Sequence, residues 1–443
     1  MKLLRSLYLN ERLFVAIGVQ IALFIFSFLI PGLIIVPKIL FFFFLAVLLT
    51  DIILLYRTRM GMRGHRIAPD RLSNGDENEI RLHVENLYPF KASVEVVDEI
   101  PHQFQKRDML VNLDINPGDS RVIIYNLRPV KRGEYSFGVV NVYASTPLKL
   151  FSRRFRFSAD AMVPVYPSFI QMRKYELLAI SNRLTMAGIK KIRRIGHNME
   201  FELIREYVGG DDIRTVNWKA TARRMELMVN HYQDERSQQV FSVIDKGRLM
   251  RMPFAGMSLL DYAINASLVI SNIAIKKSDK AGLITFQDKI SATLPAGKQP
   301  SQIGRIMEVL YNQKTAYRES DFSVLSNHIN RKITQRSLLL LFTNFESIYG
   351  LQRQIPYLRQ MAKQHLLVVI FFENTEMKQL LESPAPDLKT IYHKAIAEKF
   401  SYDKKLIVKE LARNGIQALL TPPENLTVNT INKYLELKAR GMI

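Results

Sequence analysis

The chain has 443 residues, more than one hydrophobic core usually holds, so we expect two or three domains. It contains no cysteine, which excludes disulfide frameworks, thiol catalysis and thiolate metal sites. Its formal net charge of +21 indicates an anionic partner, either nucleic acid or the surface of a membrane. The sequence has no zinc finger, RRM-like aromatic pattern or basic zipper, and this favours the membrane.

Two apolar runs near the N-terminus, 13–30 and 39–56, are each just long enough to cross a hydrocarbon core of roughly 30 Å. A short turn sequence, PGLIIVPK, connects them, so residues 1–60 are predicted to form a transmembrane hairpin in contact with lipid. Asp51 lies near the end of the second run, where we expect its carboxylate to reach the membrane interface. A cleaved signal peptide is the alternative, but no small-residue cleavage site follows the first run.

The distribution of basic residues predicts the orientation of this hairpin. The loop carries only Lys38, whereas both flanks are basic: Lys2, Arg5, Arg12, Arg57, Arg59, Arg63 and Arg66. Because positive charge is retained on the cytoplasmic side, we expect a multi-pass protein of the cytoplasmic (inner) membrane with its soluble domains in the cytoplasm.

Residues 61–166 change to short segments in which apolar and polar residues alternate. Turn sequences (SNGD, NPGD and KRG) separate four predicted strands at 79–86, 92–100, 121–129 and 135–145. Strands at this spacing, with no helical stretch between them, predict an immunoglobulin-like β-sandwich. No catalytic constellation is visible, so we expect a spacer or interaction module.

Residues 167–236 contain a dense alternation of opposite charges around Trp218, the single tryptophan. Asp211 and Asp212 follow two glycines and are expected to cap a helix over 213–223, with Trp218 buried against the next domain. The arginines of the segment suit bidentate pairing with its acids: Arg205, Arg214 and Arg223 with Glu200, Glu206, Asp211 and Asp212. Two interpretations stay open. The charges form a recognition surface, or they form an ion-pair network that fixes the segment against its neighbour.

The stretch RRIGHNMEFELIREYVGGDDIRTVNWKATAR resembles the signature of a bacterial family catalogued as domain of unknown function fifty-eight. The residues that fall on the pattern are Glu200, Phe201, Arg205, Glu206, Tyr207, Gly210, Asp211, Asp212, Arg214, Trp218, Lys219, Ala222 and Arg223. Weaker landmarks are RGEY at 132–135 and TPL at 146–148, the second of which departs from the usual form. The resemblance implies a membrane anchor, a C-terminal von Willebrand A-like domain and a genomic association with MoxR-type AAA+ ATPases.

Residues 237–443 alternate between buried-strand and helical patterns. Strands are predicted at 240–245, 280–286, 338–342, 366–372 and 417–420, and helices at 259–276, 301–312, 321–334, 351–364, 389–414 and 426–440. This alternation is typical of a doubly wound, mainly parallel α/β sheet, which places any site at the carboxyl ends of its strands.

A von Willebrand A-like domain implies a Mg²⁺ site built on D-x-S-x-S after the first strand. Here Asp245 is present, but Gly247 and Leu249 occupy the serine positions. Ser320 approximately matches a later threonine, and Asn344 stands where a later acid is usual. Lys246 and Arg248 add positive charge nearby, so we expect a degenerate site without metal and no bound cofactor.

The sequence lacks a P-loop, an H-E-x-x-H helix and a G-x-S-x-G elbow, so nothing in it supports an enzyme. We therefore expect a non-enzymatic, membrane-anchored scaffold or adaptor that contacts a MoxR-type AAA+ ATPase and other envelope-associated proteins, as the resemblance implies. A metal-dependent ligand-binding module is the first alternative. A basic membrane protein that binds nucleic acid is the second.

Overall fold

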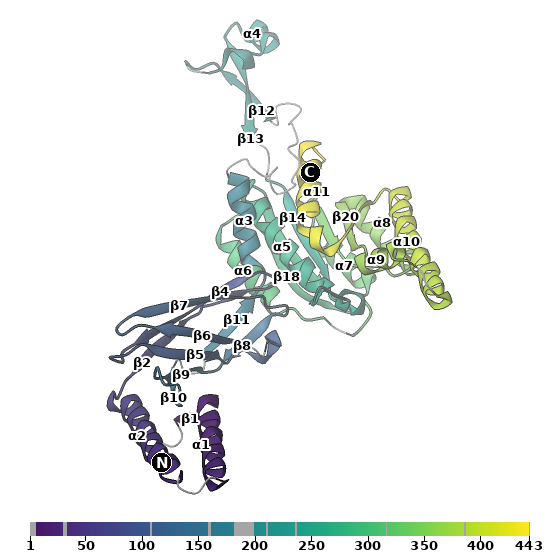
Figure 1. The fold of residues 1–443 in the computed structure, drawn as a ribbon. Coiled ribbons are helices and arrows are strands. Elements are labelled where there is room, and N and C mark those ends of the chain that lie inside the picture. Colours follow the sequence, from purple (N-terminus) through teal and green to yellow (C-terminus); the bar gives the residue numbers. More distant parts are fainter. Residues whose placement is uncertain are drawn as a thin grey trace. The chain divides into compact units, whose positions relative to one another are not determined.

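The computed structural model describes residues 6–29, 33–106, 109–157, 161–180, 199–209, 211–234, 237–315, 317–384 and 387–442. By its internal contacts the chain divides into two compact units, Met1–Tyr166 and Pro167–Ile443, which we call unit 1 and unit 2. Figure 1 shows the helices and strands of each unit in the colours of the sequence. Gly210 lies outside the described residues, and only the backbone of Glu200 and Phe201 is described.

Unit 1 begins with the short strand β1 (Leu7–Leu9) and two apolar helices, α1 (Glu11–Leu29) and α2 (Ile35–Arg57). Both helices are long and apolar enough to cross a membrane, and only 11% of either apolar window is buried inside the protein. The amide of Gln20 in α1 donates to the carbonyl of Pro37 in α2 at 2.9 Å. The predicted membrane association is therefore supported by two helices that expose apolar side chains along most of their length.

The second helix is bonded to the β-rich part of unit 1 at its C-terminal end. Asp51 is fully buried and accepts hydrogen bonds from the Thr146 hydroxyl and, at 3.0 Å, from the Phe151 amide. Arg153 donates to the carbonyls of Leu55 and Thr58 at 2.8 Å, which satisfies two helix-end acceptors. Asp51 therefore does not reach the membrane interface as expected, since the sandwich covers it.

The β-rich part of unit 1 is made of one large and two small sheets. The five-stranded sheet has the order β1, β10 (Phe151–Phe157), β9 (Val140–Ser145), β5 (Ala92–Asp98) and β6 (Leu110–Ile115). The three-stranded sheets are β2 (Met62–Ile67), β4 (Asn78–Asn86) and β7 (Ser120–Leu127), and β3 (Leu72–Ser73), β11 (Ala161–Tyr166) and β8 (Gly133–Phe137). Leu82 and Val84 of β4 share a core with Val94 and Val96 of β5, so sheets pack face to face as in a sandwich.

The strand predicted over 135–145 is wrong, because the chain changes sheets in the middle of it. β8 and β9 belong to different sheets and are separated at Gly138. The Gly138 amide donates to the Glu99 carbonyl at 2.9 Å, and a Cβ atom at this glycine would lie 2.5 Å from the Glu99 carboxylate. The crossover therefore depends on a residue without a side chain.

Unit 2 is built on a six-stranded sheet with the order β18 (Ile290–Gly297), β17 (Lys280–Phe286), β14 (Gln239–Asp245), β19 (Leu338–Phe342), β20 (Leu366–Phe372) and β21 (Gln417–Thr421). All neighbours pair in parallel except β17 and β18. The central strands are buried on both faces, which explains their continuous apolar sequences.

Helices cover both faces of this sheet (Figure 1). One core contains α5 (Leu259–Lys276), α6 (Ser301–Tyr311) and α11 (Leu426–Ala439). The other contains α7 (Phe322–Lys332), α8 (Ile348–Gln364) and α10 (Leu388–Arg413). α5 is apolar enough to span a membrane, but 83% of its apolar window is buried, so it is the central core helix.

The first helix of unit 2, α3 (Phe169–Ile180), packs against α5. Glu176 accepts from the Lys276 ammonium at 2.7 Å and from the Asn272 amide at 3.0 Å. The Ser168 amide donates to the Asn265 side chain at 2.9 Å, so the start of α3 is tied to the same helix. Residues that follow the sandwich in sequence thus form part of the α/β core.

Candidate functional site

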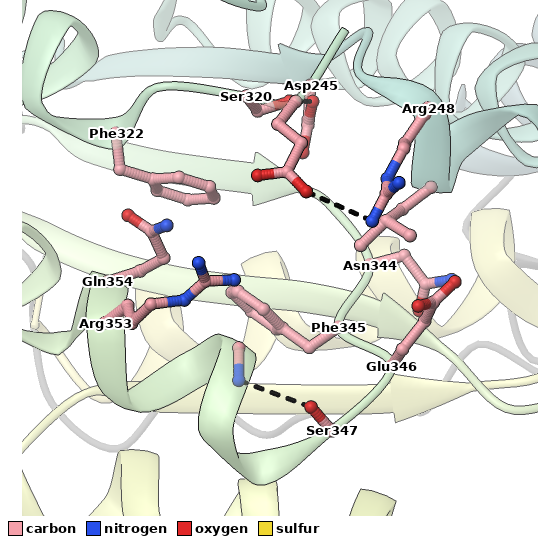
Figure 2. A pocket seen from close by; sticks show the side chains of 13 residues that line it. Asp245, Arg248, Ser320, Phe322, Asn344, Phe345, Glu346, Ser347, Arg353 and Gln354 are labelled. Atoms are coloured by element: carbon pink, nitrogen blue, oxygen red, sulfur yellow. Dashed lines mark hydrogen bonds and ion pairs between the residues drawn. The ribbon is translucent and has the colours of Figure 1, made fainter. Parts of the chain in front are cut away.

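Several predicted site residues converge where β14 and β19 end. Asp245 is the last residue of β14, and Thr343 and Asn344 follow β19. Ser320 precedes the capping residue of α7, Asp321. We call Asp245, Ser320, Thr343 and Asn344 the sheet-end site. Asp245, Ser320 and Asn344 line a cavity of about 120 Å³, together with Leu249 and Arg353. Figure 2 shows the side chains around this cavity. The carboxyl ends of parallel strands are the usual place for a ligand in such a fold.

Asp245 is 3% exposed, and both of its carboxylate oxygens accept hydrogen bonds. Oδ1 accepts from the Gly247 amide at 2.8 Å and from the Ser320 hydroxyl, and Oδ2 accepts from the Thr343 hydroxyl at 2.7 Å. Burial raises the pKa of the Asp245 carboxyl, whereas these hydrogen bonds act in the opposite direction. The nearby Arg248 does not bind this acid and pairs with Glu319 at 3.0 Å.

Gly247 and Ser320 share one small volume. A Cβ atom on Gly247 would lie 2.1 Å from the Ser320 hydroxyl oxygen, which is closer than any side-chain contact allows. Ser320 therefore fills the space that a serine at position 247 would need. Thr343 was missed by the sequence analysis, although a hydroxyl directly after the buried strand LLLLF was a usable signal.

Mg²⁺ requires an octahedral set of oxygen ligands with available lone pairs. The side chains of Gly247 and Leu249 have no oxygen. The hydroxyls of Ser320 and Thr343 donate their hydrogens to Asp245. The sheet-end site therefore lacks the two side-chain oxygens that a D-x-S-x-S pattern would supply at positions 247 and 249.

A lysine lies beside the sheet-end site. The ammonium of Lys404, on α10, donates to Oδ1 of Asn344 at 2.6 Å and lies 5.6 Å from the centre of the Phe371 ring. Burial lowers the pKa of Lys404 to about 8, against which the negative charge of Glu346 acts. Among the described residues no carboxylate lies within 4.0 Å of this ammonium, so its charge has only a neutral hydrogen-bond partner.

The charged segment of the sequence forms a separate feature, which we call the signature hairpin. It consists of β12 (Met199–Glu206), β13 (Met228–Asp234) and the loop between them. The Arg205 guanidinium pairs with Asp211 at 2.6 Å, and Asp211 also accepts from the Val208 amide at 3.0 Å. These bonds join residues of the hairpin to one another.

The helix predicted over 213–223 is interrupted. A 3₁₀ turn, Ile213–Thr215, is capped by Asp212, and α4 (Trp218–Arg224) starts after a second cap, Asn217. The Asn217 side chain accepts from the Ala220 amide and donates to Asn230 of β13 at 2.8 Å. The chain breaks at Val216–Asn217 because this asparagine binds the partner strand as well as the helix start.

The predicted burial of Trp218 is wrong, since this side chain is 68% exposed. Ile213 (71%) and Met225 (95%) are exposed in the same loop. Arg214, Lys219 and Arg223 are also exposed and form no ion pair with any described side chain. Of the expected ion pairs, the described part of the hairpin thus contains the one between Arg205 and Asp211.

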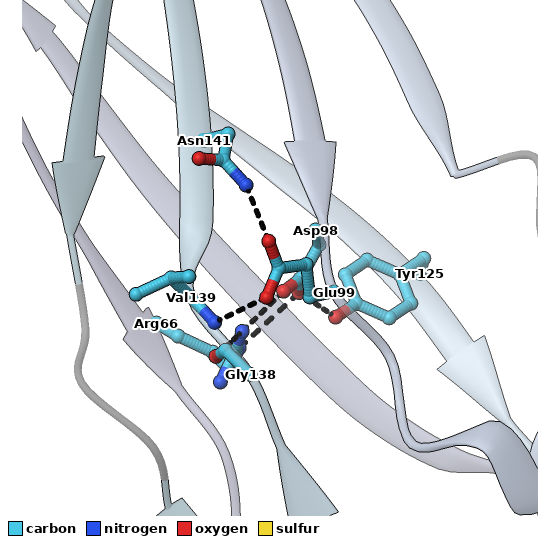
Figure 3. A network of polar contacts seen from close by, with 7 residues as sticks. All are labelled: Arg66, Asp98, Glu99, Tyr125, Gly138, Val139 and Asn141. Carbon is cyan, nitrogen blue, oxygen red and sulfur yellow. Dashed lines mark hydrogen bonds and ion pairs between the residues drawn. The ribbon is translucent and has the colours of Figure 1, made fainter. Parts of the chain in front are cut away.

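A further buried charge cluster lies in unit 1 (Figure 3). Asp98 accepts from Nε of Arg66 at 3.2 Å, from Nη2 of the same arginine, and from the Tyr125 hydroxyl. Arg66 also donates to the Gly138 carbonyl at 2.9 Å. Since burial beside Asp98 raises the pKa of Tyr125, this phenol stays protonated and holds β2, β5 and β7 together. We assign this cluster to the stability of the sandwich.

Comparison with known proteins places part of the chain in a family. Residues 203–381 match the model of a family described as protein of unknown function DUF58. The uncharacterized protein YeaD of Bacillus subtilis is 26% identical over 218 residues, which are 47% of this chain and 53% of YeaD. The chain therefore spans about half the length of that relative.

Two solved structures have weak similarity. BatB from Bacteroides thetaiotaomicron is 14% identical, with 46% of this chain and 100% of BatB covered and a TM-score of 0.31. A CARDB domain from Pyrococcus furiosus is 16% identical, with 24% of this chain and 93% of that domain covered and a TM-score of 0.17. Neither score assigns a fold to the chain. The family model and YeaD support the resemblance seen in the sequence: residues 203–381 match the DUF58 family, which is described as a family of unknown function.

Proposed function

We propose that this chain is a membrane-anchored adaptor that binds another protein through its signature hairpin. The observation that carries the proposal is the exposure of Trp218, Ile213 and Met225 within one loop. Large apolar side chains exposed together mark interaction surfaces, and tryptophan is among the residues that contribute most to binding energy.

The polar contacts of the hairpin support this role. The bonds of Arg205 with Asp211 and of Asn217 with Asn230 fix the loop from within. A loop that is already ordered loses less conformational entropy when it binds a partner. The two interpretations of these charges, a recognition surface and an ion-pair network, are therefore compatible, since the network can shape the surface that binds a partner.

The anchor supports the adaptor role in a second way. Asp51 and Arg153 join the end of α2 to the sandwich, so a force on the soluble part is transmitted to a membrane helix. We propose that both ends of the helical hairpin are cytoplasmic, because basic residues flank it on both sides. The soluble domains would then face cytoplasmic partners.

The proposed partner is a MoxR-type AAA+ ATPase, as the family resemblance implies, with other envelope-associated proteins as further partners. We also propose that unit 2 is a von Willebrand A-like domain that works without a resident metal. The sequence at positions 247 and 249 supports this, because Gly247 and Leu249 offer no side-chain oxygen where a D-x-S-x-S site would take two of its ligands.

Affinity purification of the full chain from detergent extract, with and without ATP, tests the proposal. We expect an AAA+ ATPase to be recovered and the Trp218→Ala variant to reduce its recovery at least fivefold. Tyr392→Ala is the matched control, because Tyr392 is an equally exposed aromatic residue (67%) on α10. Recovery of no AAA+ protein under either condition, or equal loss in both variants, would contradict the proposal.

The exposed basic residues of the same loop make nucleic-acid binding a second candidate. Arg214, Lys219, Arg223 and Arg224 lie next to the exposed apolar side chains. Binding to phosphates through such residues weakens steeply with salt. Titrations with duplex DNA and RNA at two salt concentrations separate the two candidates. Nucleic-acid binding predicts an affinity that falls with salt and is lost in Lys219→Glu, whereas the adaptor proposal predicts no such affinity.

A further inference from the structure

A cavity in unit 2 lies next to Lys404. Its volume is about 470 Å³, within the usual range for small-molecule sites. It opens at the carboxyl ends of β19, β20 and β21, and α9 (Thr375–Glu382) and α10 contribute to its wall. The sequence analysis did not predict this cavity, and the proposed function does not use it.

The wall of the cavity is mostly apolar, with one inner charge. Apolar residues from six different segments contribute to it, among them Phe254, Leu259, Phe372, Met377, Phe400 and Leu420. Lys404 is partly buried, whereas Lys378, Lys405, Glu346 and Glu376 at the same cavity are exposed to solvent. The exposed charges are of both signs and are screened by water, so they select a ligand weakly.

The ammonium of Lys404 has no described carboxylate in direct contact, although the charge of Glu346 acts on it from a greater distance. Its described hydrogen bond goes to the neutral Asn344 side chain, and no described carboxylate lies within 4.0 Å. Keeping a cation out of water without a directly bonded counter-charge is unfavourable, and an anion that reaches it gains a charge-assisted hydrogen bond. The free energy released by such pairing is greatest in an apolar surrounding.

We propose that this cavity binds a small organic carboxylate with an apolar body, whose carboxylate pairs with Lys404 and whose body contacts the apolar wall. Glu373, also partly buried at the cavity, excludes a second negative charge in its vicinity, so a monocarboxylate fits better than a dicarboxylate. The site is built from side chains outside the signature hairpin and is independent of the adaptor proposal.

Ligand-observed NMR on the full chain in lipid nanodiscs, with empty nanodiscs as the blank, tests the site. The probes are 2-naphthoate, 2-naphthylmethanol and 2-naphthylmethylamine, which share an apolar body and differ in charge. We expect 2-naphthoate to bind above the blank and at least tenfold more tightly than the alcohol or the amine. Equal binding of the three probes, or no naphthoate binding above the blank, would overturn the proposal.

Three variants assign the contact to one residue. Lys404→Met should weaken naphthoate binding at least tenfold, and Lys405→Met, which removes an exposed lysine of the same cavity, should change it less than twofold. Lys404→Arg keeps the positive charge and should retain binding within about fivefold. Thermal melting of each variant verifies the fold. A folded Lys404→Met variant that binds naphthoate like the natural chain would contradict the assignment.

Discussion

Two lysines of unit 2, Lys438 and Lys404, are both shielded from solvent but differ in what lies beside them. Lys438, on α11, donates to Asp279 at 2.8 Å and to the Lys277 carbonyl at 3.1 Å. Asp279 also accepts from the Tyr434 hydroxyl and from the Gln238 amide. Lys404 has a neutral partner, Asn344, and a cavity.

The difference indicates two roles for a buried cation in one domain. The pair of Lys438 and Asp279 lies just before β17 and is closed by its own hydrogen bonds, so it has no capacity for a ligand. Lys404 lies at the opposite, carboxyl-terminal end of the strands, where its charge is incompletely compensated. A closed pair contributes to stability, whereas an incompletely compensated charge is available for binding.

Removal of the closed pair should have the largest effect. Lys438→Met leaves the Asp279 carboxylate, which is 2% exposed, without its cation, and we expect a loss of about 3–5 kcal/mol in the free energy of unfolding. Denaturant unfolding followed by far-UV circular dichroism measures it. The double variant Lys438→Met with Asp279→Asn removes both charges and should recover part of the loss; a double variant as unstable as the single one would contradict this explanation.

Two buried acids of unit 2 differ in a similar way, since Asp279 is bonded by a cation and Asp245 by hydroxyls and a backbone amide. Gly247→Ser should destabilise the protein by about 1–3 kcal/mol, because the new Cβ atom would lie 2.1 Å from the Ser320 hydroxyl. Adding Ser320→Ala should relieve most of this loss. Gly304→Ser, with nothing within 4 Å of its Cβ, is the control and should be nearly neutral in the same melting experiment.

The protonation of Lys404 should also make the stability of the protein depend on pH. Its pKa is lowered from 10.5 to about 8 in the folded protein, so between these values the unfolded chain holds a proton that the native state has released. The stability contribution of Lys404 should therefore rise with pH from about 8 to 10.5, by about 1–3 kcal/mol. The difference in unfolding free energy between the natural chain and Lys404→Met, measured from pH 7 to 10.5, isolates this contribution. Lys405→Met should show the pH dependence of the natural chain.

The sequence predicted the strands of unit 2 most accurately where they are buried on both faces. The predicted bounds of β17, β19 and β20 agree with the structure. A short, continuous apolar run between turn residues is typical of a strand buried on both faces of a parallel sheet. The antiparallel edge strand β18 and the short helix α9 were not predicted. Each is only partly buried, which leaves a weak hydrophobic pattern.

Contacts between distant positions were the main source of error. Asp51 pairs with Thr146, 95 positions away, and the sequence shows neither that pairing nor the burial that results. Lys404 lies in a helix rich in lysine, and nothing local distinguishes it from the exposed Lys405. Periodicity reports which face of an element is apolar, but the compensation of an individual charge depends on the tertiary fold.

The smallest expected effect concerns Trp218, which was predicted to be buried. Trp218 is 68% exposed, so Trp218→Ala should change the free energy of unfolding by no more than about 0.5 kcal/mol, although tryptophan in a core costs several times as much to remove. Because the chain contains a single tryptophan, acrylamide quenching of its fluorescence reports this side chain alone. We expect quenching close to that of a free indole in the isolated chain and protection when the proposed partner is bound. Strong protection in the isolated chain would mean that Trp218 is covered by the protein itself, and the hairpin would then be a structural contact and not a binding surface.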